Sequence, residues 1–193
     1  TEGSEIFYDF RYPLVRQTLY EDFGLQRVRV LHGAVAEALE AHYGPEAEEH
    51  ADELAFHFSR TGGTRFGQKA KRYLMAAGRK AFDRRADQEA INYFEGVLER
   101  IDTDGDESRA TFTTVLPLLA RAHTHVGHFD QAIELWKGAE GYLTPADEQY
   151  PSVQRALGIT HVWRGDHEGA AEAFAKGLAS ARKREDRQAT VRL

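Results

Sequence analysis

The sequence predicts an all-α protein, a right-handed superhelix of antiparallel helix pairs, with a short strand at its N-terminus. Apolar residues recur at helical spacing over long stretches, as Val28, Leu31, Val35 and Leu39 do on one face of a predicted helix. After residue 12, no useful length of chain shows the period of two that a half-buried strand requires. Three segments between residues 85 and 181 also repeat one arrangement of small and aromatic residues.

The first 24 residues predict a strand followed by a helix. Residues 5–12, EIFYDFRY, are rich in aromatic side chains and have no helical period, which favours a short strand. Pro13 suits the first position of a helix, because the N–H that proline lacks has no partner there. We expect this helix to end at Gly24, in the left-handed conformation that caps many helices.

Glycine and proline divide the rest of the chain into successive helices. The next helix is expected over 25–43, and the pair Gly44-Pro45 ends it. Another is expected over 46–60, because acidic residues fill its first turn, where the helix dipole favours them. Beyond the break at 62–63, we expect helices at about 66–84, 88–101, 107–126, 129–142, 147–164 and 167–183.

The repeated segments are RADQEAINYFEGVLERI, GHFDQAIELWKGAEGYL and GDHEGAAEAFAKGLASA. Each contains an alanine and, four residues later, a large aromatic residue: Ala90 and Phe94, Ala132 and Trp136, Ala170 and Phe174. An alanine lets two helices approach closely, and we expect the ring to fill the gap between its own helix pair and the next pair. The preceding helices supply small residues at matching places, namely Gly78, Ala120 and Gly158.

These segments resemble the tetratricopeptide repeat. Their alanines lie 42 and then 38 residues apart, longer than the 34 residues of that family, and the excess falls in polar stretches at 102–108 and 144–151. Gly127 and Gly165 occupy the turn between the two helices, where the first repeat has Arg85 instead. The resemblance implies three stacked repeats that share one core, at about 65–101, 107–143 and 147–183, followed at 184–193 by the start of a further helix.

The N-terminal half carries a second resemblance. FRYPLVRQTLYEDF, LHGAVAEALEAHYG and ELAFHFSRTGG, with the helices that follow to residue 101, resemble a stretch of bacterial multidomain signalling ATPases. In that family the stretch follows a winged-helix domain and leads into a helical repeat array, and the proteins often end in a LuxR-type DNA-binding domain or couple to an adenylate cyclase. The resemblance implies that 1–23 is the remnant of the winged-helix domain and 24–64 a connecting helical pair. The start at Thr1, without a methionine, suggests an excised segment.

Composition excludes several classes of function. The chain has no cysteine, which removes disulfides, thiol nucleophiles and cysteine-based zinc sites. Its formal net charge of -6 does not attract nucleic acid or anionic lipid overall. DNA binding by the basic helix at 69–85 is an alternative, and it would require an affinity that falls steeply with salt. No apolar run approaches the roughly 20 residues that cross a bilayer. We therefore expect a cytoplasmic protein with no membrane contact and no direct nucleic-acid partner.

No catalytic, cofactor or metal site is predicted. GGTRFGQK (62–69) has the glycine spacing of an ATP-binding loop, but Gln68 stands where the lysine must be and a helix precedes the segment. Two of the histidines, His123 and His161, occupy the inward tyrosine position of the repeat family, where a packed imidazole is the ordinary interpretation. There is no G-x-S-x-G turn.

A binding groove is the remaining prediction. In the repeat family the first helix of each pair lines the concave face, and this implies the following groove residues: Arg72, Arg79, Phe82, Arg121, His125, Arg155 and Trp163. Arginines beside an aromatic anchor suit an acidic peptide or a small anionic ligand. In the alternative interpretation, the arginines are only solvated and Trp163 packs against the next helix.

The predicted function is therefore a non-catalytic protein-interaction or ligand-sensing scaffold. The resemblance to signalling ATPases implies that it is the regulatory arm of such a protein or of a transcription regulator, in contact with neighbouring domains of the same chain. The alternative is a structural spacer or a self-association module that has no ligand of its own.

Overall fold

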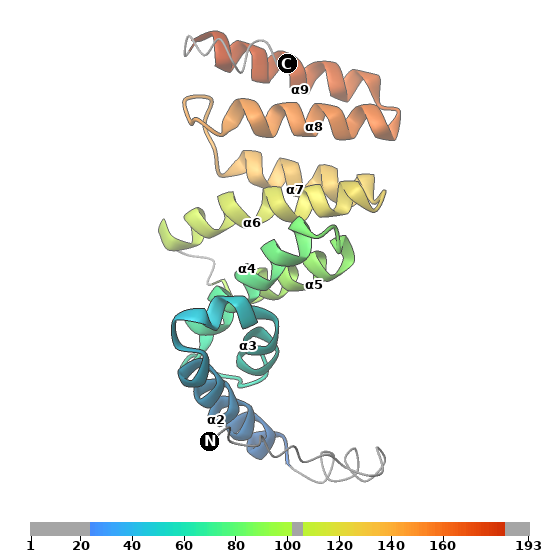
Figure 1. Cartoon of the computed structure of the whole chain (residues 1–193). Helices are drawn as coiled ribbons and strands as arrows, with labels where there is room; N and C mark the ends of the chain where they lie inside the picture. The colour runs from blue at the N-terminus through green and yellow to red at the C-terminus, as the bar shows by residue number, and fades with distance from the viewer. Residues whose placement is uncertain (1–23, 102–105, 184–193) are drawn as a thin grey trace.

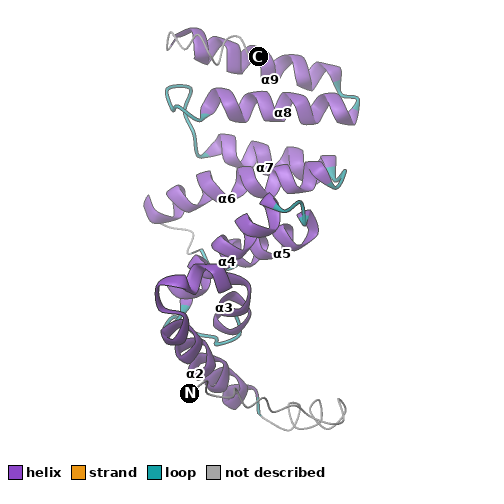
Figure 2. Ribbon diagram, viewed as in Figure 1, coloured by secondary structure: helices purple, strands orange, loops and turns teal. Residues whose placement is uncertain are grey.

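The computed structural model describes residues 24–101 and 106–183. The strand and helix expected before residue 24, and the helix expected after residue 183, lie outside these residues. The described chain is helical and contains no strand (Figure 2). Its elements are α2 (Leu25–Tyr43), η1 (Gly44–His50), α3 (Ala51–Phe58), α4 (Gly67–Asp83), α5 (Asp87–Leu98), α6 (Asp106–His125), α7 (Phe129–Gly141), α8 (Tyr150–Arg164) and α9 (His167–Lys183).

The helices stack one after another into an elongated solenoid (Figure 1). Helices α4 and α5, α6 and α7, and α8 and α9 form antiparallel pairs, and each pair packs against the next. This arrangement follows from the amphipathic helices, because one pair cannot cover its own apolar faces and needs a neighbour to do so. The all-α superhelix predicted from the sequence is therefore the observed fold.

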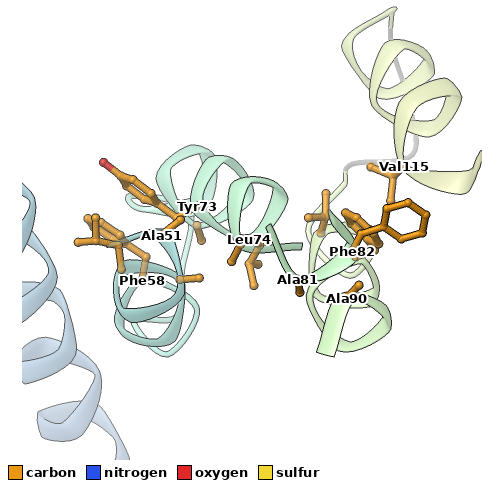
Figure 3. Close-up of a cluster of buried hydrophobic side chains, with 14 of the residues drawn as sticks. Ala51, Phe58, Tyr73, Leu74, Ala81, Phe82, Ala90 and Val115 are labelled. Atoms are coloured by element: carbon orange, nitrogen blue, oxygen red, sulfur yellow. The ribbon is translucent and has the colours of Figure 1, made fainter. Parts of the chain in front are cut away.

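Two apolar cores run along the solenoid. The first joins α2 to α6 and contains Phe58 and Tyr73, whose rings stack 5.5 Å apart. Figure 3 shows how side chains from α3, α4, α5 and α6 meet in this core. The second core joins α6, α7, α8 and α9 around Trp136 and Leu157. Because α6 contributes to both cores, the solenoid is continuous through this helix.

In the first and third helix pairs, the aromatic residue packs against a glycine of the same pair. A Cβ atom placed on Gly78 in α4 would lie 2.5 Å from Cε1 of Phe94 in α5. The same distance separates a Cβ on Gly158 in α8 from Cε1 of Phe174 in α9. The sequence placed these rings in the gap between one pair and the next. The structure also brings each ring against a glycine within its own pair, because a residue without a side chain leaves room for a ring edge.

Two details of the first helices differ from the prediction. The helix expected over 46–60 is instead the 3-10 helix η1 followed by α3, because His50 has φ -106° and ψ 31° and interrupts the α-helical backbone. Gly24 is not in the left-handed conformation, since its φ is -54°. It precedes α2, and its carbonyl accepts the N–H groups of Arg27 and Val28. Gly24 is therefore the N-terminal cap residue of α2.

The turn between α4 and α5 contains a backbone exception. Arg85 has φ 65°, and the corresponding turns of the next two pairs contain Gly127 at 82° and Gly165 at 87°. A side chain in the left-handed conformation costs roughly 1–2 kcal/mol, whereas glycine adopts it freely. The first pair therefore keeps the turn of the repeat at a cost that the others avoid.

A pair of histidines joins α2 to α3. Nδ1 of His32 lies 3.0 Å from Nδ1 of His57, so one ring donates to the other. Burial lowers the pKa of both imidazoles, and the nearby Arg60 lowers them further. The negative charge of Glu53 partly offsets this by raising the pKa of His57. The contact is therefore suited to uncharged rings.

Acidification from pH 7 to pH 5 is expected to lower the melting temperature. The unfolded histidines have a pKa of about 6.5, so below that pH the unfolded state binds more protons than the folded state, and stability falls. A His32→Gln/His57→Gln variant should show a shallower fall, measured by circular dichroism. The hydrogen bonds from Lys69 and Tyr73 hold the pKa of Glu40 below its ordinary value of 4.5. The contribution of Glu40 to stability is therefore lost only below the range from pH 7 to pH 5. If the melting temperature of the variant falls as much as that of wild type between pH 7 and pH 5, the prediction is contradicted.

None of the described helices combines the length and the apolar character that crossing a bilayer requires.

Candidate binding groove

A groove of about 610 Å³ opens along the first helices of the three pairs, α4, α6 and α8. Helix α4 contributes Arg79, and α6 and α8 form the two long walls. Trp136 of α7 reaches the groove from behind, between these two walls.

The structure brings together most of the residues that the sequence assigned to the groove. Its lining includes Arg79, Arg121, His125, Arg155 and Trp163. Three helices separated by long stretches of sequence thus contribute to one surface.

Phe82 and Arg72 lie outside the groove lining. Phe82 is buried beneath it, where its ring stacks on His125 at 5.2 Å and the Arg121 guanidinium lies 4.9 Å from its centre. Phe82 therefore supports two groove residues from below. Arg72 lies further along α4 and donates to Glu48 of η1, with Nη2 2.7 Å from Oε1. The sequence did not anticipate this partner because the segment 46–50 was expected to be part of a longer helix.

The groove floor is made of small and β-branched residues. Thr124 of α6 and Thr160 of α8 are both buried, and their hydroxyl oxygens lie 3.5 Å apart across the floor. Each hydroxyl donates to the backbone carbonyl four residues earlier, as threonine commonly does within a helix. The two long walls therefore meet at a floor whose hydroxyl groups already have partners.

The groove is electropositive. Arg79, Arg121 and Arg155 line it, and no aspartate or glutamate does so among the described residues. Within residues 24–101 and 106–183, none of the three forms an ion pair. Arginines elsewhere on the surface do have acidic partners, for example Arg65 with Glu37, at 3.0 Å. Three unpaired guanidinium groups on a concave surface concentrate positive potential there, although the whole chain carries a net charge of -6.

His125 is held at the groove edge by the first helix pair. Its Nδ1 lies 2.8 Å from Oδ1 of Asp87 in α5. Nη1 of Arg85, in the strained turn before α5, lies 3.1 Å from its Nε2. The second pair is therefore tied to the first by polar contacts at the groove edge.

Trp136 and Pro117 are among the groove residues that were not predicted as site residues. The sequence assigned Trp136 to the core because of its place in the repeat, yet its indole also reaches the groove. Pro117 lies inside α6 and also lines the groove. A proline within a predicted helix at 107–126 was a signal that could have been used, because it removes one backbone hydrogen bond at a known place.

Metal chemistry has no obvious location in the described part of the chain. Residues 24–101 and 106–183 contain no group of three or more histidine, aspartate or glutamate side chains that could hold an ion. At 62–69 a helix precedes the glycine-rich segment, and α4 begins at Gly67.

The same helical architecture occurs in a known protein. The solved structure "MamA MSR-1 C2" has a TM-score of 0.51 with this chain at 22% sequence identity, and the match covers 88% of this chain and 99% of that one. The chain has a tetratricopeptide-like fold. A second MamA structure, "MamA AMB-1 P212121", has a TM-score of 0.49 and 22% identity, and the match covers 86% of this chain and 91% of that one. No protein-family model matches the sequence. No curated protein matches it either. At this identity the likeness concerns the fold alone.

Proposed function

We propose that the solenoid is a non-catalytic scaffold whose groove binds an acidic segment of a partner protein. The observation that carries this proposal is a set of three groove arginines that form no ion pair with the residues that the structure describes, Arg79, Arg121 and Arg155. A guanidinium group binds a carboxylate through two parallel hydrogen bonds, so each of these arginines offers a strong and directional contact.

An aromatic anchor lies in the same groove. Trp163 is 56% exposed, and its ring lies 6.3 Å from that of Phe129. A bound segment that covers the indole removes a large apolar surface from water, and tryptophan together with arginine is the composition most typical of binding hot spots.

The length of the groove favours a peptide over a compact anion. Its arginines come from three separate helices, α4, α6 and α8, and its volume is about 610 Å³. A small anion would contact part of this surface, whereas an extended acidic segment can contact all three helices in turn. We therefore favour a peptide partner and keep a small anionic ligand as an outcome of the test.

Selection of random peptides displayed on phage tests this proposal. Peptides enriched on the wild-type protein are expected to be rich in aspartate and glutamate. Their affinity should fall about tenfold for each groove arginine replaced by glutamine, because a hydrogen bond to a charged group contributes about 1.5–3 kcal/mol. Isothermal titration calorimetry with wild type and with the Arg79→Gln/Arg121→Gln/Arg155→Gln variant measures this loss.

The matched control removes three arginines outside the groove. Arg65, Arg72 and Arg84 form exposed ion pairs, and replacing them with glutamine changes the net charge equally. This variant should retain affinity for the selected peptides within about twofold, since surface ion pairs contribute little to the fold. Equal losses in both variants would show that binding depends on total charge and would contradict a specific groove. Enrichment of neutral or basic peptides would contradict the acidic partner.

The sequence also supports a more specific proposal about context. We propose that the solenoid is the regulatory arm of a multidomain bacterial signalling ATPase, and the pattern over residues 5–101 supports this. The coding sequence on either side provides the test. A nucleotide-binding module upstream would support the proposal, and a different upstream domain would contradict it.

A second candidate function is self-association. Large apolar side chains are exposed along α2: Leu25 is 67% exposed, Val30 62%, Leu31 45% and Val35 41%. An apolar helix face of this kind is typical of a contact with another surface. Size-exclusion chromatography with light scattering tests this function, and a monomer at every concentration would contradict it.

A further inference from the structure

We infer that the floor of the groove binds the main chain of a peptide, through the indole N–H of Trp136 and the carbonyl of Thr113. This inference rests on the proposed function, and it adds a reason why the partner is a polypeptide and not another polyanion. Two independent observations support it, one for a donor and one for an acceptor.

The donor is Nε1 of Trp136. The residue is 3% exposed and its indole lines the groove, but Nε1 has no acceptor in the described part of the chain. Buried polar groups almost always have a partner, and one that lacks it calls for an explanation. Nε1 exposes less than 1 Å², so bulk water does not solvate it in the free protein. A ligand oxygen that parts the covering side chains would give it the acceptor it lacks.

The acceptor follows from Pro117. In an α-helix the carbonyl of residue 113 accepts the N–H of residue 117, and proline has no N–H to donate. Both Thr113 and Pro117 line the groove, so the carbonyl left without its usual donor belongs to the groove face of α6. The Thr113 hydroxyl donates to the carbonyl of Ala110 and so does not replace the missing donor.

A peptide main chain complements both groups. It carries a carbonyl oxygen for Trp136 and an N–H for Thr113, whereas a carboxylate can only accept and leaves the Thr113 carbonyl without a donor. Arg121 lies in the last turns of α6. Arg121 therefore lies about one turn beyond Pro117 along α6. A bound segment would place an acidic side chain on Arg121 and a main-chain amide beside Pro117.

Two synthetic polyanions test this inference. One is an N-acetylated hexaglutamate peptide, and the other is an oligo-acrylate of matched charge, which has no amide groups. We expect wild type to bind the peptide about fivefold to tenfold more tightly than the acrylate, in keeping with one or two net hydrogen bonds. Isothermal titration calorimetry with both probes measures the difference.

Two variants remove the floor groups separately. Trp136→Phe deletes the indole N–H but keeps an aromatic ring. Pro117→Ala restores an N–H that can occupy the Thr113 carbonyl, and it should raise the melting temperature because proline disfavours the middle of a helix. Each variant should bind the peptide about threefold to tenfold more weakly and bind the acrylate as wild type does.

Pro117→Ala separates recognition from folding, since it is expected to make the protein more stable and its peptide binding weaker. Unchanged peptide affinity in this variant would overturn the inference, whatever happens in Trp136→Phe. Equal affinity of wild type for the two polyanions would also overturn it, while the acidic groove itself would stand. If neither polyanion binds, the proposed function fails and this inference fails with it. If acrylate binding is lost in the groove-arginine variant and kept in Trp136→Phe and Pro117→Ala, the arginines bind the charges and the floor groups bind the main chain, as the inference requires.

Discussion

Phe94→Ala is expected to lower the free energy of unfolding by about 3–5 kcal/mol, the range for removing a buried phenylalanine ring. The ring of Phe94 is 0% exposed and fits against Gly78 of the neighbouring helix. Its loss leaves a cavity between α4 and α5, and this cavity lies in the core that joins the first half of the solenoid. Urea denaturation followed by circular dichroism measures the change.

Phe174→Ala is the matched control for that experiment. Phe174 has the same place in its pair and the same contact with a glycine, Gly158, but its side chain is only partly buried. In the described chain, α9 packs mainly on α8, so the ring lacks a cover on its outer side. The loss should be clearly smaller than for Phe94. Equal losses would show that the glycine contact, and not the depth of burial, determines the energy.

Gly78→Ala is the second substitution with a large expected effect. The added Cβ would lie 2.5, 2.8 and 3.1 Å from three carbon atoms of the Phe94 ring, and that ring is fully buried and cannot turn away. Overpacking of this kind costs about 1–3 kcal/mol. The helix preference of alanine over glycine, roughly 0.8–1 kcal/mol, offsets part of that cost. We expect a net decrease in stability, measured as a lower urea midpoint.

Gly141→Ala should act in the opposite direction. Gly141 ends α7, is exposed, and has no atom within 4 Å of an added Cβ. The same change of residue should therefore leave stability equal or raise it by up to about 1 kcal/mol. If both substitutions destabilise the protein, the close approach at Gly78 does not explain its loss.

The helices were predictable because their signals are local. The apolar spacing and the glycines that end each segment placed α9 at 167–183, where the structure has it. The error at 46–60 has a different origin. The acidic residues of that segment are compatible with an α-helix, but the backbone at His50 changes course so that α3 can pack on α4. A tertiary contact determined that break, and no local pattern records it.

The positive charge of the groove could be predicted from the sequence, but the contribution of Trp136 to its floor could not. Arg79 and Arg121 follow from the register of the repeat, because each comes directly after the small residue of its helix, Gly78 or Ala120. Arg155 lies four residues before the equivalent position in α8, which is the same helix face one turn earlier. Arg72 has an equivalent register and still lies elsewhere, since η1 supplies Glu48 as its partner. Trp136 could not be assigned from register alone. A core position in a second helix does not reveal that the buried indole also borders the groove.

The placement of the groove across three helix pairs has a mechanical consequence. A stack in which each pair contacts only its neighbours can bend elastically, because small rotations between successive pairs change its curvature. A segment bound to α4, α6 and α8 together would fix two of those rotations at once. Such an occupant would stiffen the whole stack, and the distance between its two ends would then report whether the groove is filled.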